Sequence, residues 1–192
     1  MNSVKQTIID ETMRLFSEKG YAATSIRDIA NAVDIKSASL YYYINSKKDL
    51  LNQIMKTYLT ELIDGAIDVV SKKSKPEDKL EQIIKHHVSS HGREKLAALV
   101  VDTEYRSLEG ENKKEIKRLR KSYENIWTDI LNEGFNKGVF HFSDKHITAY
   151  ALLSQCTGVA HWYREEGKYT LHEITEQYIT LGLQMVHYQG GE

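Results

Sequence analysis

The chain has 192 residues, a formal net charge of −1 and 41% hydrophobic residues, enough apolar material for a packed core. This near-zero charge excludes a protein that coats nucleic acid through bulk positive charge, so any DNA binding must depend on locally placed cations. The single cysteine, Cys156, excludes a disulfide within the chain and suits a reducing cytoplasm. No segment is apolar enough to span a bilayer and no signal peptide is visible, so we expect a cytoplasmic protein without membrane contact.

Three short helices are expected in the N-terminal quarter of the chain. A periodic apolar face predicts a first helix, which Gly20 should close. A capping box of Ser25 and Asp28 predicts a second helix. The pattern then breaks at residues 34–36, and Ser37 is the expected N-cap of a short third helix.

Two short helices, a tight turn and the capped start of a longer helix form the layout of a helix-turn-helix, which places its second helix in the DNA major groove. Residues 36–48 hold three serines, three lysines and three tyrosines but no acid. A second capping box, Ser46 with Asp49, opens the longer helix at Lys47, where backbone N–H groups and cations suit a phosphate. A helical interaction module without a DNA-binding role would carry the same caps and remains an alternative.

We predict ten DNA-contacting residues from this segment. Base or near-base contacts are expected from Arg27, Lys36, Ser37, Ser39 and Tyr41. Phosphate contacts are expected from Thr24, Tyr42, Tyr43, Lys47 and Lys48. The two sets can exchange members, because a sequence does not determine rotamers.

The remainder of the chain also shows helical periodicity. Gly92 should stop one of these helices, Ser143 should cap another, and a capping box of Thr170 and Glu173 should open the last. Residues 108–112 have the composition of a loop. The expected helices cover residues 47 to about 71–75, 76–91, 94–107, 113–135, 143–163 and 170–186.

These elements predict an all-α protein of about nine helices. An N-terminal three-helix helix-turn-helix domain should occupy residues 1–48, and a helical ligand-binding and dimerisation domain residues 49–192. The helix expected at 143–163 is apolar almost all round and contains many small residues, so it needs cover on several sides. We expect it and the final helix to pair with their twofold mates in a four-helix homodimer interface, the alternative being a central core helix of a monomer.

A basic block at residues 112–121 has two interpretations, a solvated helix face or an anion subsite beside an apolar cavity. Arg120, Tyr123 and Trp127 share one helical face, which suits a ligand with a charged head and an apolar tail. His87 and His91 have a metal-compatible spacing but no evident third ligand, so we expect no metal and no cofactor. No nucleophile elbow or phosphate-binding glycine loop is present, so we do not expect an enzyme.

Three N-terminal segments resemble the DNA-binding domain of the tetracycline-repressor (TetR) family of transcriptional regulators. They are Leu15 to Tyr21, Thr24 to Ala30, and Ser39 to Tyr43 followed by Asn45 to Leu50. The chain departs from the family pattern at Tyr43, where His is common, and at Ile44, where Phe is common. A looser C-terminal pattern is similar to family members that repress fatty-acid or sterol-ring degradation and respond to acyl-CoA thioesters. It comprises Arg120 to Tyr123, Trp127, Gly134, Gly138 to Phe140 and His161 to Tyr163.

The resemblance implies a homodimeric repressor that binds a palindromic operator in double-stranded DNA and is released by a small-molecule inducer. It implies an acyl-CoA effector held by Arg120, Tyr123, Trp127 and Trp162. Half-sites should lie about 34–36 Å apart or a multiple of one turn. The long helix from Lys47 should transmit the effector's influence. Activation instead of repression stays open, and so does an alternative role in regulating a multidrug efflux gene in response to hydrophobic drugs.

Overall fold

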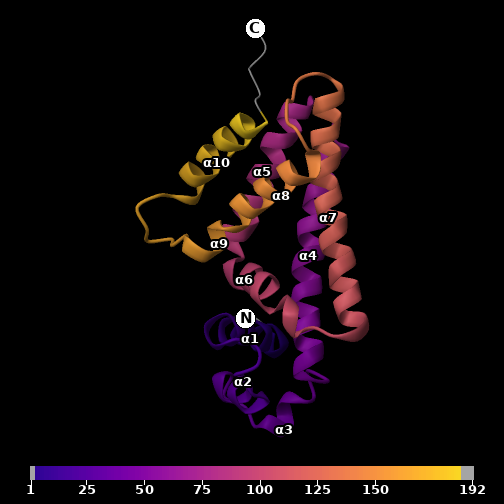
Figure 1. Cartoon of the computed structure of the whole chain (residues 1–192). Helices are drawn as coiled ribbons and strands as arrows, with labels where there is room; N and C mark the ends of the chain where they lie inside the picture. Colours follow the sequence, from indigo (N-terminus) through magenta and orange to yellow (C-terminus); the bar gives the residue numbers. More distant parts are fainter. Residues whose placement is uncertain (1–2, 187–192) are drawn as a thin grey trace. The chain divides into compact units, whose positions relative to one another are not determined.

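The computed structural model describes residues 3–186, which form α-helices and one short 3₁₀ helix and contain no β-strand (Figure 1). The all-α prediction is therefore confirmed. No helix in this described part is long and apolar enough to cross a membrane. In chain order the helices are α1 (Val4–Lys19), α2 (Ile26–Ala32), α3 (Ser37–Leu40), α4 (Lys47–Ser71), α5 (Pro76–Arg93), α6 (Lys95–Thr103), η1 (Glu104–Ser107), α7 (Gly110–Asn136), α8 (Lys145–Thr157), α9 (Val159–Trp162) and α10 (Leu171–Met185).

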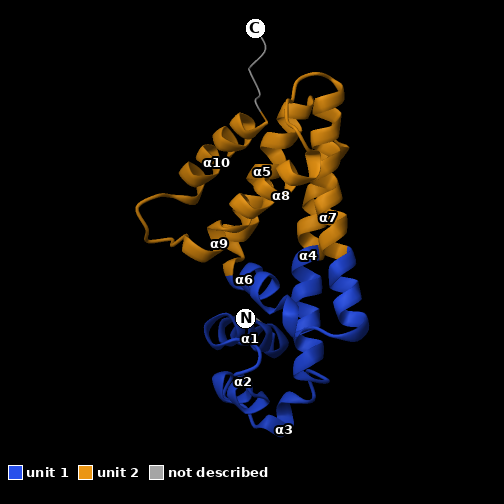
Figure 2. Ribbon diagram, viewed as in Figure 1, with its two compact units in different colours: residues 1–59, 96–118 blue, residues 60–95, 119–192 orange. Residues whose placement is uncertain are grey.

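The chain divides into two compact units, which Figure 2 colours separately. Unit 1 comprises residues 1–59 and 96–118, and unit 2 comprises residues 60–95 and 119–192. Helices α4 and α7 each contribute residues to both units. The compact units therefore differ from the functional domains expected at residues 1–48 and 49–192, and that functional boundary stays a prediction.

The termini of the helices in unit 1 follow local rules. Ser25 and Asp28 form the predicted capping box of α2, and the Ser46 hydroxyl accepts a hydrogen bond from Asp49 N at 3.0 Å at the start of α4. Helix α1 ends at Gly20, whose φ of 83° lies in the left-handed region that favours glycine. Each of these predicted helix ends is confirmed.

Two predicted N-caps are wrong by one residue. Lys36 occupies the N-cap position of α3, so Ser37 is the first helical residue and offers no side-chain cap. Asp144, not Ser143, caps α8, and its carboxylate accepts hydrogen bonds from the backbone N–H groups of His146 at 2.8 Å and Ile147 at 2.9 Å. An ionised carboxylate accepts both bonds and complements the positive helix end, which a hydroxyl does less well.

Three other predicted boundaries are also wrong. Helix α7 begins at Gly110, within the segment expected to be a loop. The helix expected at 143–163 consists of α8 and α9, which abut at Gly158, so the nine expected helices correspond to ten α-helical segments in residues 3–186. Gly92 lies inside α5 instead of ending it. A Cβ there would approach Leu171 Cδ1 to 2.4 Å, so this glycine is a packing site for the start of α10.

Helix α5 is the element against which the others in unit 2 pack. It contacts α8, α9 and α10 (Figure 1). On α10, Gly182 allows close packing, because a Cβ there would lie 2.4 Å from Ile84 Cδ1. On α4, Gly65 accommodates the His86 ring, whose Nε2 hydrogen-bonds Leu62 O at 2.8 Å. Two polar side chains of α5, those of His87 and His91, lie buried in the interior of unit 2.

Candidate functional site

A tight turn joins α2 to α3 in unit 1. Asp34 has a φ of 53° and is the one non-glycine residue with positive φ among residues 3–186. Asp tolerates this left-handed conformation better than most residues. The backbone N–H of Ile35 closes the end of α2 by donating to Ala30 O at 3.0 Å. Leu40 of α3 is fully buried and anchors the short helix to the core.

Three consecutive tyrosines follow α3 and remain exposed. The exposed fractions of the side chains are 56% for Tyr41, 87% for Tyr42 and 40% for Tyr43, whereas Ile44 is buried. Around them, Ser37 and Ser39 are half-buried, and Arg27, Lys36 and Lys48 are exposed. Nine of the ten predicted DNA-contacting residues, all but Thr24, therefore retain some exposed surface.

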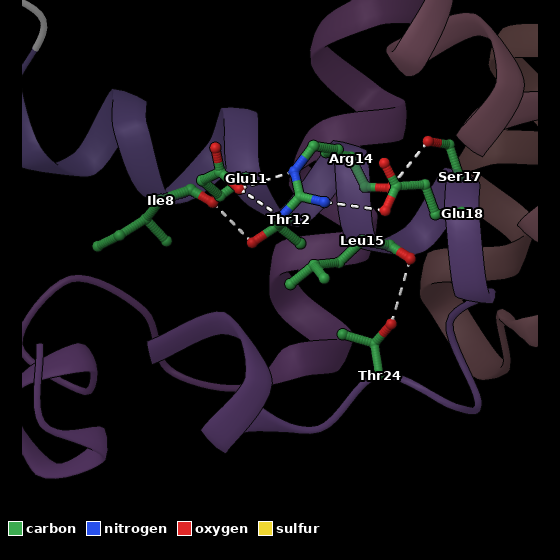
Figure 3. A network of polar contacts seen from close by, with 8 residues as sticks. All are labelled: Ile8, Glu11, Thr12, Arg14, Leu15, Ser17, Glu18 and Thr24. Carbon is green, nitrogen blue, oxygen red and sulfur yellow. Dashed lines mark hydrogen bonds and ion pairs between the residues drawn. The ribbon is translucent and has the colours of Figure 1, made fainter. Parts of the chain in front are cut away.

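Thr24 differs from these residues because it is 1% exposed. Its hydroxyl donates to Gly20 O at 2.9 Å and approaches Leu15 O at 3.4 Å (Figure 3). Figure 3 also shows Arg14 of α1 paired with Glu11 and Glu18 of the same helix, and these three side chains are partly exposed to solvent. The structure thus uses Thr24 to close the turn after α1, although a phosphate contact was predicted for it.

Lys47 also has an internal role. Its Nζ donates to Tyr21 O at 2.8 Å and to Thr24 O at 2.7 Å, and lies 4.2 Å from the centroid of the Tyr21 ring. A cation that satisfies two turn carbonyls and stacks on an aromatic ring links the start of α4 to the α1–α2 turn. We call this arrangement the Lys47 clamp. Lys48, the next residue, is exposed.

The basic block on α7 is partly neutralised by neighbouring acids. Lys114 pairs with Glu111 at 2.7 Å, and Lys121 pairs with Glu124 at 2.5 Å. Exposed pairs of this kind contribute little to stability but reduce the local positive field. The block therefore resembles a solvated helix face more than a preformed anion site.

A buried polar cluster lies inside unit 2, and His87 of α5 is at its centre. Its Nδ1 is 2.9 Å from the Tyr123 hydroxyl on α7, and its Nε2 is 3.1 Å from Thr157 Oγ1 on α8. His87 and Tyr123 are 2% and 4% exposed. One imidazole thus links three helices through two hydrogen bonds.

Aromatic contacts surround this imidazole. The His91 ring stacks on it at a centroid distance of 3.8 Å, and the Trp127 ring meets it edge-on at 5.7 Å. Trp127 is fully buried. We call His87, His91, Tyr123, Trp127 and Thr157 the His87 cluster.

His87 and Tyr123 of the His87 cluster are held uncharged by burial. Burial, followed by the neighbouring His91 and His86, lowers the pKa of His87 well below 6.5. Burial also raises the pKa of Tyr123, and raises that of the adjacent Cys156 thiol to about 12. Both ring nitrogens of His87 are engaged in hydrogen bonds, so His87 and His91 are not arranged as a pair of metal ligands.

The structure brings together only part of the predicted ligand-binding set. The rings of Tyr123 and Trp127 are in contact at 6.4 Å. Arg120 is half-buried on the same helix, but Trp162 of α9 is 47% exposed and does not belong to the cluster. Thr157 was not predicted as a site residue, because nothing in its local pattern distinguishes it from other helical threonines.

Two family models together match most of the chain. The model described as "Bacterial regulatory proteins, tetR family" matches residues 8–54. The model described as "Tetracyclin repressor-like, C-terminal domain" matches residues 73–186. The first covers α2, α3 and the Lys47 clamp, and the second covers every member of the His87 cluster.

Similarity to individual proteins also extends over the full length. The HTH-type transcriptional repressor KstR2 of Mycobacterium tuberculosis is 26% identical over 193 residues, covering 95% of this chain and 92% of that protein. The fatty acid metabolism regulator protein of Bacillus subtilis is 24% identical over 182 residues, covering 94% of each. The crystal structure of AibR in complex with isovaleryl coenzyme A and operator DNA has the same fold, with a TM-score of 0.84, 22% identity and coverage of 93% of this chain and 97% of that chain.

The Lys47 clamp predicts a difference between adjacent lysines. Lys47→Met leaves two turn carbonyls without their charged donor and should lower the local stability of the α1–α2 region by about 1–2 kcal/mol. Lys48→Met removes an equal charge from an exposed position and should change the local stability of the α1–α2 region by less than about 0.5 kcal/mol. Hydrogen exchange of α1 and α2 amides measures both. Equal protection in the two variants would show that the clamp is not structural.

The lowered pKa of His87 predicts a pH-dependent stability of unit 2. The imidazole is neutral in the folded protein, whereas in the unfolded chain it binds a proton below about pH 6.5. The free energy of unfolding should therefore be fully retained above pH 6.5 and fall by up to about 1.4 kcal/mol per pH unit below it. His87→Gln should flatten this slope, whereas His141→Gln, at an exposed position, should not.

Urea unfolding followed by tryptophan fluorescence measures this effect in unit 2, because the two tryptophans of the chain, Trp127 and Trp162, both lie there. A His87→Gln variant with the wild-type loss of stability between neutral and acidic pH would disprove the assignment.

Proposed function

This chain belongs to the TetR family of bacterial regulatory proteins, and we propose that it is a homodimeric repressor that binds a palindromic operator and is released by a small-molecule effector. The observation that carries the DNA-binding part is the set of exposed side chains flanking α3, Lys36 before it and Tyr41 to Tyr43 after it, next to the capped start of α4. The similarity to proteins named as transcriptional repressors supports repression over activation.

In this proposal α3 enters the major groove and the start of α4 faces the backbone. Leu40 holds α3 in place from the core side, which leaves its neighbours for the DNA. Base or near-base contacts come from Arg27, Lys36, Ser37, Ser39 and Tyr41. Phosphate contacts come from Tyr42, Tyr43 and Lys48, while Thr24 and Lys47 support the motif from within.

Exposed apolar side chains on unit 2 support a homodimer. On α8, Ile147 and Tyr150 are 69% and 53% exposed, and on α10 Leu181 is 37% exposed. Large apolar side chains on neighbouring helices favour association, because burying them against a second copy removes them from water. A four-helix interface of two α8 and two α10 helices would use this surface and separate the half-sites by about 34–36 Å or a multiple of one turn.

The interior of unit 2 is the proposed effector site, with Tyr123 and Trp127 as contacts and Arg120 near a charged part of the ligand. An acyl-CoA thioester is the proposed effector class. Two observations support it: the similarity to a fatty acid metabolism regulator, and the fold shared with AibR, which was crystallised with isovaleryl coenzyme A. The effector must prefer the non-binding conformer by several kcal/mol to change operator occupancy from mostly bound to mostly free. Helix α4, which has residues in both units, is the proposed route.

Sequence-specific DNA binding tests the main proposal. The full chain should bind DNA from its own upstream region in a fluorescence anisotropy assay, with an affinity that falls as salt rises. Lys48→Met should reduce the slope of log affinity against log salt by about 0.9 per lost phosphate contact. Lys85→Met, an exposed lysine of α5, is the matched control and should leave the slope unchanged. Binding that ignores sequence and salt would instead support an interaction module.

Calorimetry with isovaleryl-CoA and a long-chain acyl-CoA tests the effector class, with free coenzyme A as the control. A bound effector should weaken operator binding by about 5- to 150-fold, the range of typical allosteric coupling. If no acyl-CoA binds and operator affinity does not change, this effector class is wrong while the DNA-binding proposal is unaffected.

A further inference from the structure

The Trp127 indole presents an unusual hydrogen-bond donor inside unit 2. The residue is 0% exposed, and its Nε1 has no hydrogen-bond partner among residues 3–186. An indole nitrogen can only donate, so an acceptor must come from elsewhere. A buried donor left unpaired lowers stability, and few such groups occur in folded proteins.

The neighbouring polar groups are already used by one another. His87 is paired with Tyr123 on one side and Thr157 on the other. The indole N–H lies near the Tyr123 hydroxyl but does not reach hydrogen-bond geometry. The Tyr123 hydroxyl could in principle donate to His87 and accept from the indole together, but its position leaves Trp127 Nε1 outside hydrogen-bond geometry.

No fixed charge lies in the immediate interior of this region. The buried polar residues in the described part of unit 2 are histidines and threonines, and none is Lys, Arg, Asp or Glu. An ionised carboxylate entering here would lose its hydration without gaining a counter-charge, which is far more costly than burying a neutral carbonyl that accepts a hydrogen bond.

We propose that Trp127 Nε1 is the recognition donor for an uncharged hydrogen-bond acceptor on the effector, a ketone, ester or thioester carbonyl, and that the His87 cluster rejects a free carboxylate at the same point. The proposal rests on the effector-responsive function above and specifies which part of an effector unit 2 recognises. A regulator built this way distinguishes an activated acyl group from the corresponding free acid, because only the former presents a neutral carbonyl.

The test follows the indole resonance of Trp127 in ¹H–¹⁵N spectra of the full chain. Only two tryptophans are present, so Trp162→Phe assigns the signal and also serves as the matched aromatic control. The probes are 2-octanone and octanoate, compared at about pH 7.5, where octanoate is ionised. We expect 2-octanone to move the Trp127 N–H signal downfield, and octanoate to bind at least about tenfold more weakly.

A variant separates the donor from the apolar ring. Trp127→Phe keeps an aromatic side chain but removes the N–H, so 2-octanone should bind about tenfold more weakly to it, whereas Trp162→Phe should bind like the wild type. If Trp127→Phe does not fold, the comparison of the two probes on the wild-type chain still decides the question.

Three results would overturn the inference. They are an unmoved Trp127 signal at saturating 2-octanone, equal affinity for octanoate, and unchanged 2-octanone affinity in a folded Trp127→Phe variant. Operator binding is measured in parallel. A moved Trp127 signal without any change in operator affinity supports this inference and contradicts the effector-release part of the proposed function, whereas weakened operator binding with an unmoved Trp127 signal does the reverse.

Discussion

The interior of unit 2 depends on one imidazole. His87 lies on α5, and its two ring nitrogens reach α7 through Tyr123 and α8 through Thr157. Because the ring is buried, each bond is made in a low-dielectric surrounding, and losing either partner would leave a buried polar atom unpaired. The His87 ring therefore couples α5 to both α7 and α8 through its two hydrogen bonds. This makes the cluster sensitive to any molecule that brings its own donors and acceptors into the interior.

In unit 1, polar side chains bind backbone carbonyls of a turn, whereas those of the His87 cluster in unit 2 bind one another. The Lys47 cation and the Thr24 hydroxyl satisfy carbonyls of the α1–α2 turn, so these side chains hold the helix-turn-helix together. The three tyrosines that follow Leu40, Tyr41 to Tyr43, remain exposed. With a net charge of only −1 for the whole chain, the proposed DNA binding would depend on a few well-placed contacts in each subunit and on their doubling in the proposed dimer.

Local signals predicted helix ends well, and tertiary packing accounts for the errors. The capping boxes at Ser25 and Thr170 occur as expected, because the atoms involved lie within one turn of chain. Gly92 was expected to end α5, but the close approach of Leu171 gives this glycine a packing role that local sequence cannot show. The cap at Asp144 was missed because Ser143 offers the same signal one residue earlier.

The same contrast between local signals and tertiary packing applies to the residues of the candidate sites. The i, i+4 spacing of Tyr123 and Trp127 correctly placed both rings on one face of α7, since helical periodicity alone determines it. Trp162 was included through family resemblance, and the structure exposes it instead. Thr157 could not be found, because its role depends on α8 meeting α5. An unpaired donor such as Trp127 Nε1 is likewise visible only once every neighbour's hydrogen bonds are known. An unsatisfied group that lowers stability without helping packing is the kind of local inconsistency that binding sites retain, because the ligand supplies what the fold lacks.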